Sequence, residues 1–221
     1  MAAAFLAGAL VLSSCGASNA IKGAGIGAGA GALIGAGIGR VAGNTAIGAA
    51  IGGVIGGTAG TLIGKKMDKQ KKELEKDVKD AKIESINDGQ AIRVTFDSGI
   101  LFGTGNATLS ASAQNSLRKF ATDVLVPNSD MDVSIMGYTD NQGWKNSTAD
   151  QSREKNQALS YQRAQSVSNF LMQSGARSSQ IREVKGLGED FPVADNSTTM
   201  GKQQNRRVEV YLYASQQMIK N

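Results

Sequence analysis

The residue types available for chemistry in this 221-residue chain are restricted. It has no histidine and one cysteine, Cys15, which excludes Ser-His-Asp and Cys-His catalysis, His-ligated metals, internal disulfides and Cys-cluster zinc sites. Glu189 and Asp190 are adjacent carboxylates, but no recognisable nucleophile accompanies them. We therefore expect a protein that is not an enzyme, with no catalytic residue, no metal site and no cofactor.

Polar side chains that could form a binding site are found in four ordered motifs of the C-terminal two-thirds. All four motifs contain a charged residue, and two of them begin with glycine. The motifs are GYTD at residues 137–140, NQALSYQRA at 156–164, GLGE at 186–189 and NRRVE at 205–209.

This set of motifs resembles the OmpA-like peptidoglycan-binding domain family, and the resemblance covers roughly residues 90–213. It implies recognition of diaminopimelate in the stem peptide of peptidoglycan, with Asp140 holding the ammonium group and Arg163 the carboxylate. The chemistry agrees, because a zwitterionic amino acid needs one fixed anion and one cation, and arginine supplies a planar, two-point contact. The alternative for Asp140 and Arg163 is a structural salt bridge with no ligand.

Thr139, Asn156 and Leu159 complete the expected ligand-binding set. Asn156, Leu159 and Arg163 recur at spacings of three and four residues, so they share one stripe of a helix. We expect the backbone N–H groups at the start of this helix to add partial positive charge for carboxylates.

Two features of the region leave alternatives open. Alternation along a strand lets at most one of Arg206 and Arg207 reach the pocket, so the other is expected to pair with a surface carboxylate. The loop at 141–155 is longer than is usual in the family and contains the single tryptophan, Trp144. Trp144 is either a lid over the glycan or a packed loop residue.

Strands and helices must alternate to position these motifs. Their order predicts a β-α-β-α-β-β domain of the α/β class, an α+β sandwich with helices on one face of a mixed sheet. The apolar patterns place strands at 91–96, 131–137, 181–185 and 206–213, and helices at 110–126 and 154–173.

Cys15 follows an apolar run at residues 2–12 that is too short to span a bilayer, which takes about 20 residues. The run suits a signal peptide, and the sequence LSSCG at 12–16 resembles a bacterial lipobox. We therefore predict a signal peptide over 1–14 and lipidation of Cys15, although no Lys or Arg precedes the run. The alternative is an idle cysteine after an apolar helix.

Residues 15–64 contain two glycine ladders. Glycine recurs every fourth residue from Gly23 to Gly39 and again from Gly48 to Gly64. Small residues at this spacing allow close packing of helices in lipid, so we expect a glycine-zipper helical hairpin in or on a membrane, or an oligomer. The alternative is a flexible tether.

Residues 65–82 have eight lysines and five acids, and we expect a solvated helical linker that separates the membrane from a domain at 83–221. Its thin apolar stripe consists of Met67, Leu74, Val78 and Ala81. The domain itself has 14 basic and 14 acidic residues, and aromatics are only 5% of the chain, so no nucleic-acid partner is expected.

The whole chain resembles outer-membrane lipoproteins of the YiaD type. The resemblance implies a lipid-anchored protein of the cell outer membrane whose C-terminal domain lies in the periplasm and tethers the membrane to peptidoglycan. Its expected partners are peptidoglycan, the membrane and a second copy of the chain. The alternative function is a membrane-active or pore-like oligomer formed by the glycine zipper.

Overall fold

The computed structural model describes residues 58–86, 89, 91–215 and 218. The predicted signal peptide, Cys15 and most of the glycine ladders lie outside these residues. Within the described part of the chain, no helix is both long enough and apolar enough to cross a membrane.

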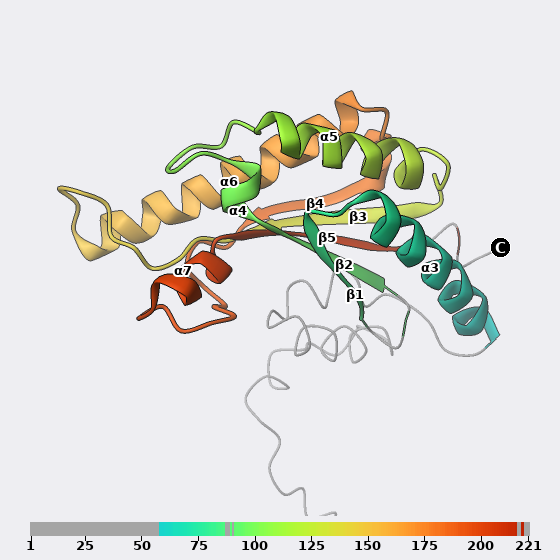
Figure 1. Cartoon of the computed structure of the whole chain (residues 1–221), viewed down its shortest axis with the longest axis horizontal. Helices are drawn as coiled ribbons and strands as arrows, with labels where there is room; N and C mark the ends of the chain where they lie inside the picture. Colours follow the sequence, from blue (N-terminus) through green and yellow to red (C-terminus); the bar gives the residue numbers. More distant parts are fainter. Residues whose placement is uncertain (1–57, 87–88, 90, 216–217, 219–221) are drawn as a thin grey trace, which may run out of the picture.

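Five strands form one mixed sheet in the order β1-β2-β5-β3-β4 (Figure 1). The β3–β4 pair is parallel and the other pairs are antiparallel. This confirms the predicted α/β class, and each of the four predicted strands is present to within one residue at each end. The strands are β1 (Ala81–Ile86), β2 (Ala91–Asp97), β3 (Met131–Gly137), β4 (Ile181–Gly186) and β5 (Arg207–Ala214).

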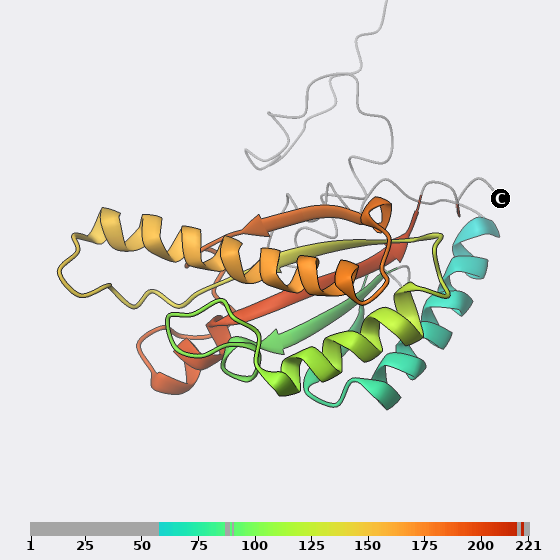
Figure 2. The ribbon, with the colours of Figure 1, turned by 90° about the horizontal axis from the view of Figure 1, so that it is seen from above.

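Helices α5 and α6 lie side by side over one face of the sheet (Figures 1 and 2). The apolar residues of β2, β3 and β5 that point to this face form the main core with α5, α6 and α3. The predicted helix at 110–126 is present as α5 followed by the π-helical segment η2. The helices are α3 (Thr58–Asp77), α4 (Ser98–Leu101), α5 (Ala111–Lys119), η2 (Phe120–Leu125), α6 (Ala149–Gln173), η3 (Ser178–Gln180) and α7 (Thr199–Asn205).

The lysine-rich segment differs from the expected solvated linker. Its helix, α3, ends at Asp77, and residues 81–86 form β1, so the predicted boundary at residue 83 falls within a strand. Met67, Leu74 and Val78 are at most 1% exposed and belong to the main core. Burial of this stripe joins α3 to the domain, because apolar side chains are stabilised when they leave water.

Two polar contacts fix α3 against the segment that follows η2. Lys66 Nζ lies 2.6 Å from Asp130 Oδ2, and Gln70 Nε2 donates a hydrogen bond to Asn128 Oδ1 at 3.0 Å. The lysines of the opposite side of α3 stay in solvent, which explains why its composition suggested a solvated helix.

Helix α6 begins five residues before the predicted start at 154. Thr148 caps it: Thr148 Oγ1 accepts from the Gln151 N–H at 3.2 Å, and Gln151 Oε1 accepts from the Thr148 N–H at 3.0 Å. Asn156 therefore lies about 10 Å along the helix from Ala149. The expectation that the N–H groups of the helix start face the binding site is wrong.

The docking of α3 predicts a clear difference between its two faces. Leu74→Ala should lower the free energy of unfolding by about 2–5 kcal/mol, because it removes a fully buried side chain and leaves a cavity. Lys76→Ala, on the exposed face of the same helix, is the matched control and should change it by less than about 0.5 kcal/mol. Urea denaturation followed by circular dichroism measures both values. Equal, small effects would mean that α3 is a solvated helix.

Candidate functional site

The site is positioned by direct backbone contact between α6 and the ends of β3 and β4. A Cβ atom at Gly137 would lie 2.0 Å from the Ser160 carbonyl oxygen, and one at Gly186 would lie 2.3 Å from the Tyr161 nitrogen. Only glycine fits at either place. Ser160 Oγ accepts from the Gly188 N–H at 2.9 Å, which ties the GLGE loop to the same turn of α6.

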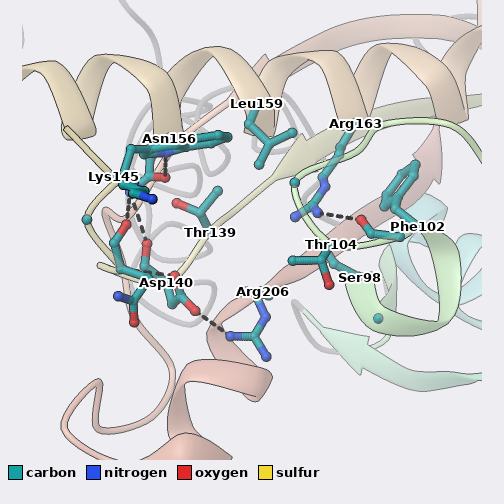
Figure 3. A pocket seen from close by; sticks show the side chains of 16 residues that line it. Ser98, Phe102, Thr104, Thr139, Asp140, Lys145, Asn156, Leu159, Arg163 and Arg206 are labelled. Carbon is teal, nitrogen blue, oxygen red and sulfur yellow. Dashed lines mark hydrogen bonds and ion pairs between the residues drawn. The ribbon is translucent and has the colours of Figure 1, made fainter. Parts of the chain in front are cut away.

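A cavity of about 460 Å³ lies beside this contact (Figure 3). Its walls come from the loop after β2, the loop after β3, one face of α6 and the residue that precedes β5. All five residues predicted to bind ligand line it. They are Thr139, Asp140, Asn156, Leu159 and Arg163.

Asp140 is 5% exposed, and its carboxylate faces the cavity (Figure 3). Asp140 Oδ1 accepts from the Gln142 N–H at 3.0 Å, and Oδ2 forms an ion pair with Arg206 Nη1. Among the described residues no ion pair joins Asp140 to Arg163, so the alternative of a salt bridge between these two is not what the structure contains. Arg206, which the sequence left undecided, is the arginine of the NRRVE motif that reaches the pocket.

Arg163 is 4% exposed and points into the same cavity from α6 (Figure 3). Its Nε donates to the Asn106 carbonyl oxygen at 3.0 Å, and its Nη2 donates to that of Gly103 at 3.5 Å. Burial lowers the pKa of Arg163, the nearby charge of Arg206 lowers it further, and the Asp140 carboxylate opposes both effects. The guanidinium stays charged at neutral pH, because an arginine side chain is not deprotonated in proteins.

Asn156 serves mainly to hold the loop after β3. Its Oδ1 accepts from Trp144 Nε1 at 2.7 Å, and its Nδ2 lies 3.4 Å from the Asp140 carbonyl oxygen and 3.3 Å from that of Gln142. Trp144 is therefore tied back to α6 while it lines the cavity, which favours a packed wall residue over a free lid. The predicted long loop is also shorter, because residues 149–155 belong to α6.

Thr139 lines the cavity at the end of β3. Its backbone N–H donates to the Gly188 carbonyl oxygen at 2.7 Å, which fixes its position beside the GLGE loop. Among the described atoms, its buried Oγ1 has no hydrogen-bond partner.

Arg207 contradicts the expectation that it pairs with a surface carboxylate. It points to the other side of the sheet, where Arg207 Nε donates to Glu209 Oε1 at 2.7 Å, and the two side chains are 3% and 2% exposed. Its guanidinium also lies over the Tyr138 ring, 3.6 Å from the ring centre. The partner is buried because this face of the sheet holds its own core around Tyr138 and Tyr211.

Sequence reasoning missed the wall formed by the loop after β2. Its residues have no common charge or spacing, and only the fold brings them opposite α6. Phe102 lies under the Arg163 guanidinium, 5.3 Å from the ring centre. The lining residues that were missed on this wall include Phe102 and Thr104, together with Ser98 at the start of α4; Lys145 of the loop after β3 was missed as well.

Comparison with known proteins agrees with this geometry. Residues 101–206 match the model of the OmpA family. These residues form an OmpA family domain. Residues 26–71 match a glycine-zipper family, which confirms the predicted type of segment, although most of it lies outside the described residues.

Three relatives extend the comparison. The chain is 36% identical to the probable lipoprotein YiaD of Escherichia coli over an alignment of 145 positions that covers 62% of each chain. It is 38% identical over 120 residues to the peptidoglycan-binding protein ArfA of Mycobacterium tuberculosis, with 54% of this chain and 34% of the relative covered. The chain thus spans less than two thirds of both relatives. The solved cell wall anchor of the type VI secretion system from Pseudomonas aeruginosa has a TM-score of 0.54 at 27% identity and covers 65% of this chain and 96% of that one.

The backbone contact at Gly137 yields a prediction. Gly137→Ala should lower the free energy of unfolding by about 1–3 kcal/mol, because the new methyl group would push α6 away from β3. Gly103→Ala is the control, since a Cβ there meets nothing closer than 3.9 Å. Thermal unfolding of both variants gives the comparison. If Gly137→Ala is as stable as Gly103→Ala, α6 does not depend on this close approach.

Proposed function

We propose that the pocket binds the stem peptide of peptidoglycan through diaminopimelate, with Asp140 contacting the ammonium group and Arg163 the carboxylate. The observation that carries the proposal is the presence of two buried, opposite charges that face one cavity without forming a pair. A zwitterionic ligand satisfies both charges at once. The OmpA family match and the peptidoglycan-binding relative support peptidoglycan as the class of ligand.

Arg206 occupies part of the site that the ammonium group needs. In the ligand-free protein it neutralises Asp140, which would otherwise be a costly buried charge. The side chain of Arg206 is 37% exposed, so it can turn toward a ligand carboxylate when an ammonium group replaces it.

The uncharged walls suit the rest of the ligand. Phe102, Leu159 and Trp144 offer apolar surface to the methylene groups of diaminopimelate. No step of bond making or breaking is part of this function, and the protein acts as a tether.

Substitution of the two charged residues of the pocket tests the proposal. Asp140→Asn should weaken binding of a soluble diaminopimelate muropeptide at least 30-fold, since loss of one partner of a buried charged contact costs about 2–5 kcal/mol. Arg163→Lys should weaken it by about tenfold or more, because the two-point contact with the carboxylate is lost. Lysine retains the charge of Arg163 but lacks its planar fork. Asp150→Asn, at an exposed acid in the first turn of α6, is the matched control. Calorimetry measures binding, and circular dichroism checks folding.

The ligand provides an independent arm of the same test. A stem peptide with lysine in place of diaminopimelate lacks the distal carboxylate, so the wild-type protein should bind it poorly. A folded Arg163→Lys variant that binds the diaminopimelate peptide within about twofold of the wild type would overturn the assignment of Arg163.

The proposed tether also needs an anchor at the other end of the chain. We propose that Cys15 is acylated and holds the protein in the outer membrane, with the described domain in the periplasm. The lipobox sequence and the similarity to a probable lipoprotein support this. Several acyl chains would make the attachment stable, because each buried CH₂ contributes about 0.8 kcal/mol.

Metabolic labelling checks the anchor directly. Cys15→Ser should abolish incorporation of a palmitate analogue and leave an uncleaved precursor, because no other thiol exists in the sequence. Ser14→Ala keeps a small residue before the cysteine and should be labelled normally. Labelling of the Cys15→Ser variant at the wild-type level would exclude acylation at this position.

A further inference from the structure

A second, shallower groove of about 640 Å³ lies next to the pocket. Thr104 and Gly105 line both cavities, so the loop that contains them is a wall of each. The groove is bounded by residues 104–108 and by one side of α6, and Figure 2 shows this loop beside the helix. A ligand held in the pocket can therefore extend into the groove across the loop.

The chemistry of the groove differs from that of the pocket. None of the described residues that line it is charged, whereas the pocket contains Asp140, Lys145, Arg163 and Arg206. The groove instead presents side-chain amides, hydroxyls and one aromatic ring. Such a surface suits an uncharged ligand rich in hydroxyl and amide groups, and it offers no cation to an anionic polymer or lipid headgroup.

Tyr161 provides the aromatic surface. Its side chain is one of the few large apolar groups left in solvent, at 47% exposure. Tyr161 Oη donates to Gln165 Oε1 at 3.2 Å, and Gln165 Nε2 donates to Asn169 Oδ1 at 2.9 Å, so the ring is held along α6. A ring fixed before binding loses little conformational entropy when a flat ligand packs on it.

The opposite wall is fixed by a residue of the pocket. Arg163 Nε donates a hydrogen bond to the Asn106 carbonyl oxygen. The side chain of the same residue is also fixed, because Asn106 Oδ1 accepts from the Thr108 N–H at 2.6 Å. The Asn106 N–H donates to the Gly103 carbonyl oxygen at 3.2 Å. The groove thus shares its support with the pocket, because Arg163 fixes the loop that lines both.

We propose that this groove binds the glycan strand of peptidoglycan beside the stem peptide held in the pocket. The proposal rests on the proposed function, because it assigns the neighbouring part of the same polymer. Sugar rings have flat C–H faces that pack on aromatic rings, and their hydroxyl and N-acetyl groups match the amides of Gln162 and Gln165.

The spacing of the two cavities fits this ligand. Two residues separate diaminopimelate from the sugar in a stem peptide, which corresponds to about 10 Å of extended chain over three residue steps. Leu159 of the pocket and Gln165 of the groove are six residues apart on α6, a rise of about 9 Å.

Calorimetry of the detergent-solubilised full chain with two soluble probes tests the proposal. The probes are the tripeptide with terminal diaminopimelate and the same tripeptide joined to its disaccharide. The wild type should bind the disaccharide-tripeptide about tenfold more tightly, which corresponds to about 1.4 kcal/mol. Tyr161→Ala should lose this advantage and bind the tripeptide alone within twofold of the wild type.

Two control variants define the contact. Tyr161→Phe keeps the ring and should keep most of the advantage, whereas Met200→Ala removes an exposed apolar side chain on α7 and should change nothing. Equal affinity of the wild type for the two probes, or an advantage that persists in Tyr161→Ala, would overturn the glycan site while the peptide pocket stands. Failure of the wild type to bind either probe would overturn the proposed function itself.

Discussion

The approach of α6 to the ends of β3 and β4 fixes the distance between the two halves of the pocket. Backbone atoms of Ser160 and Tyr161 lie where Gly137 and Gly186 have no side chain. As a result, Asp140 from the strand side and Arg163 from the helix side reach the same cavity. A helix displaced by the width of a methyl group would still cover the core, but it would separate these two groups and open the wall between them.

The charges of the pocket are stable without ligand because each is compensated locally. Asp140 has Arg206 and a backbone N–H, and Arg163 has two carbonyl oxygens and the face of Phe102. These partners differ in kind: the partly exposed side chain of Arg206 pairs with the acid, whereas backbone carbonyl oxygens accept from the buried Arg163. The acid therefore depends on a side chain at the protein surface, and Arg163 depends on the backbone of the loop after α4.

The sequence predicts the frame of the site better than its walls. In strands such as 131–137, apolar and polar residues alternate at the start, which is a local pattern that predicts a strand. Asn156, Leu159 and Arg163 follow the helical repeat, so their common face is also predicted from local pattern. The docking of α3 depends on the core residues that contact Met67 and Leu74. These contacts are distant in the sequence, so the local pattern of α3 does not predict them. β1 has a weak alternation and is defined by its pairing with β2.

The other features that the sequence did not predict also depend on long-range contacts. The partner of Arg207 could not be found from sequence, because Glu209 is buried only when the second face of the sheet is formed. The wall at 102–105 contains no charged residue and is defined by its position opposite α6. Long-range contact, rather than residue type, decides these features.

The attachment of α3 to the core has a mechanical consequence for a tether. A pull directed along the chain from Thr58 meets the buried stripe of α3 before it reaches the edge strand β1. While the 20 residues of α3 are helical they span about 30 Å, whereas the same residues fully extended span about 66–72 Å. Release of this one helix would therefore lengthen the chain that leads to β1 by about 40 Å.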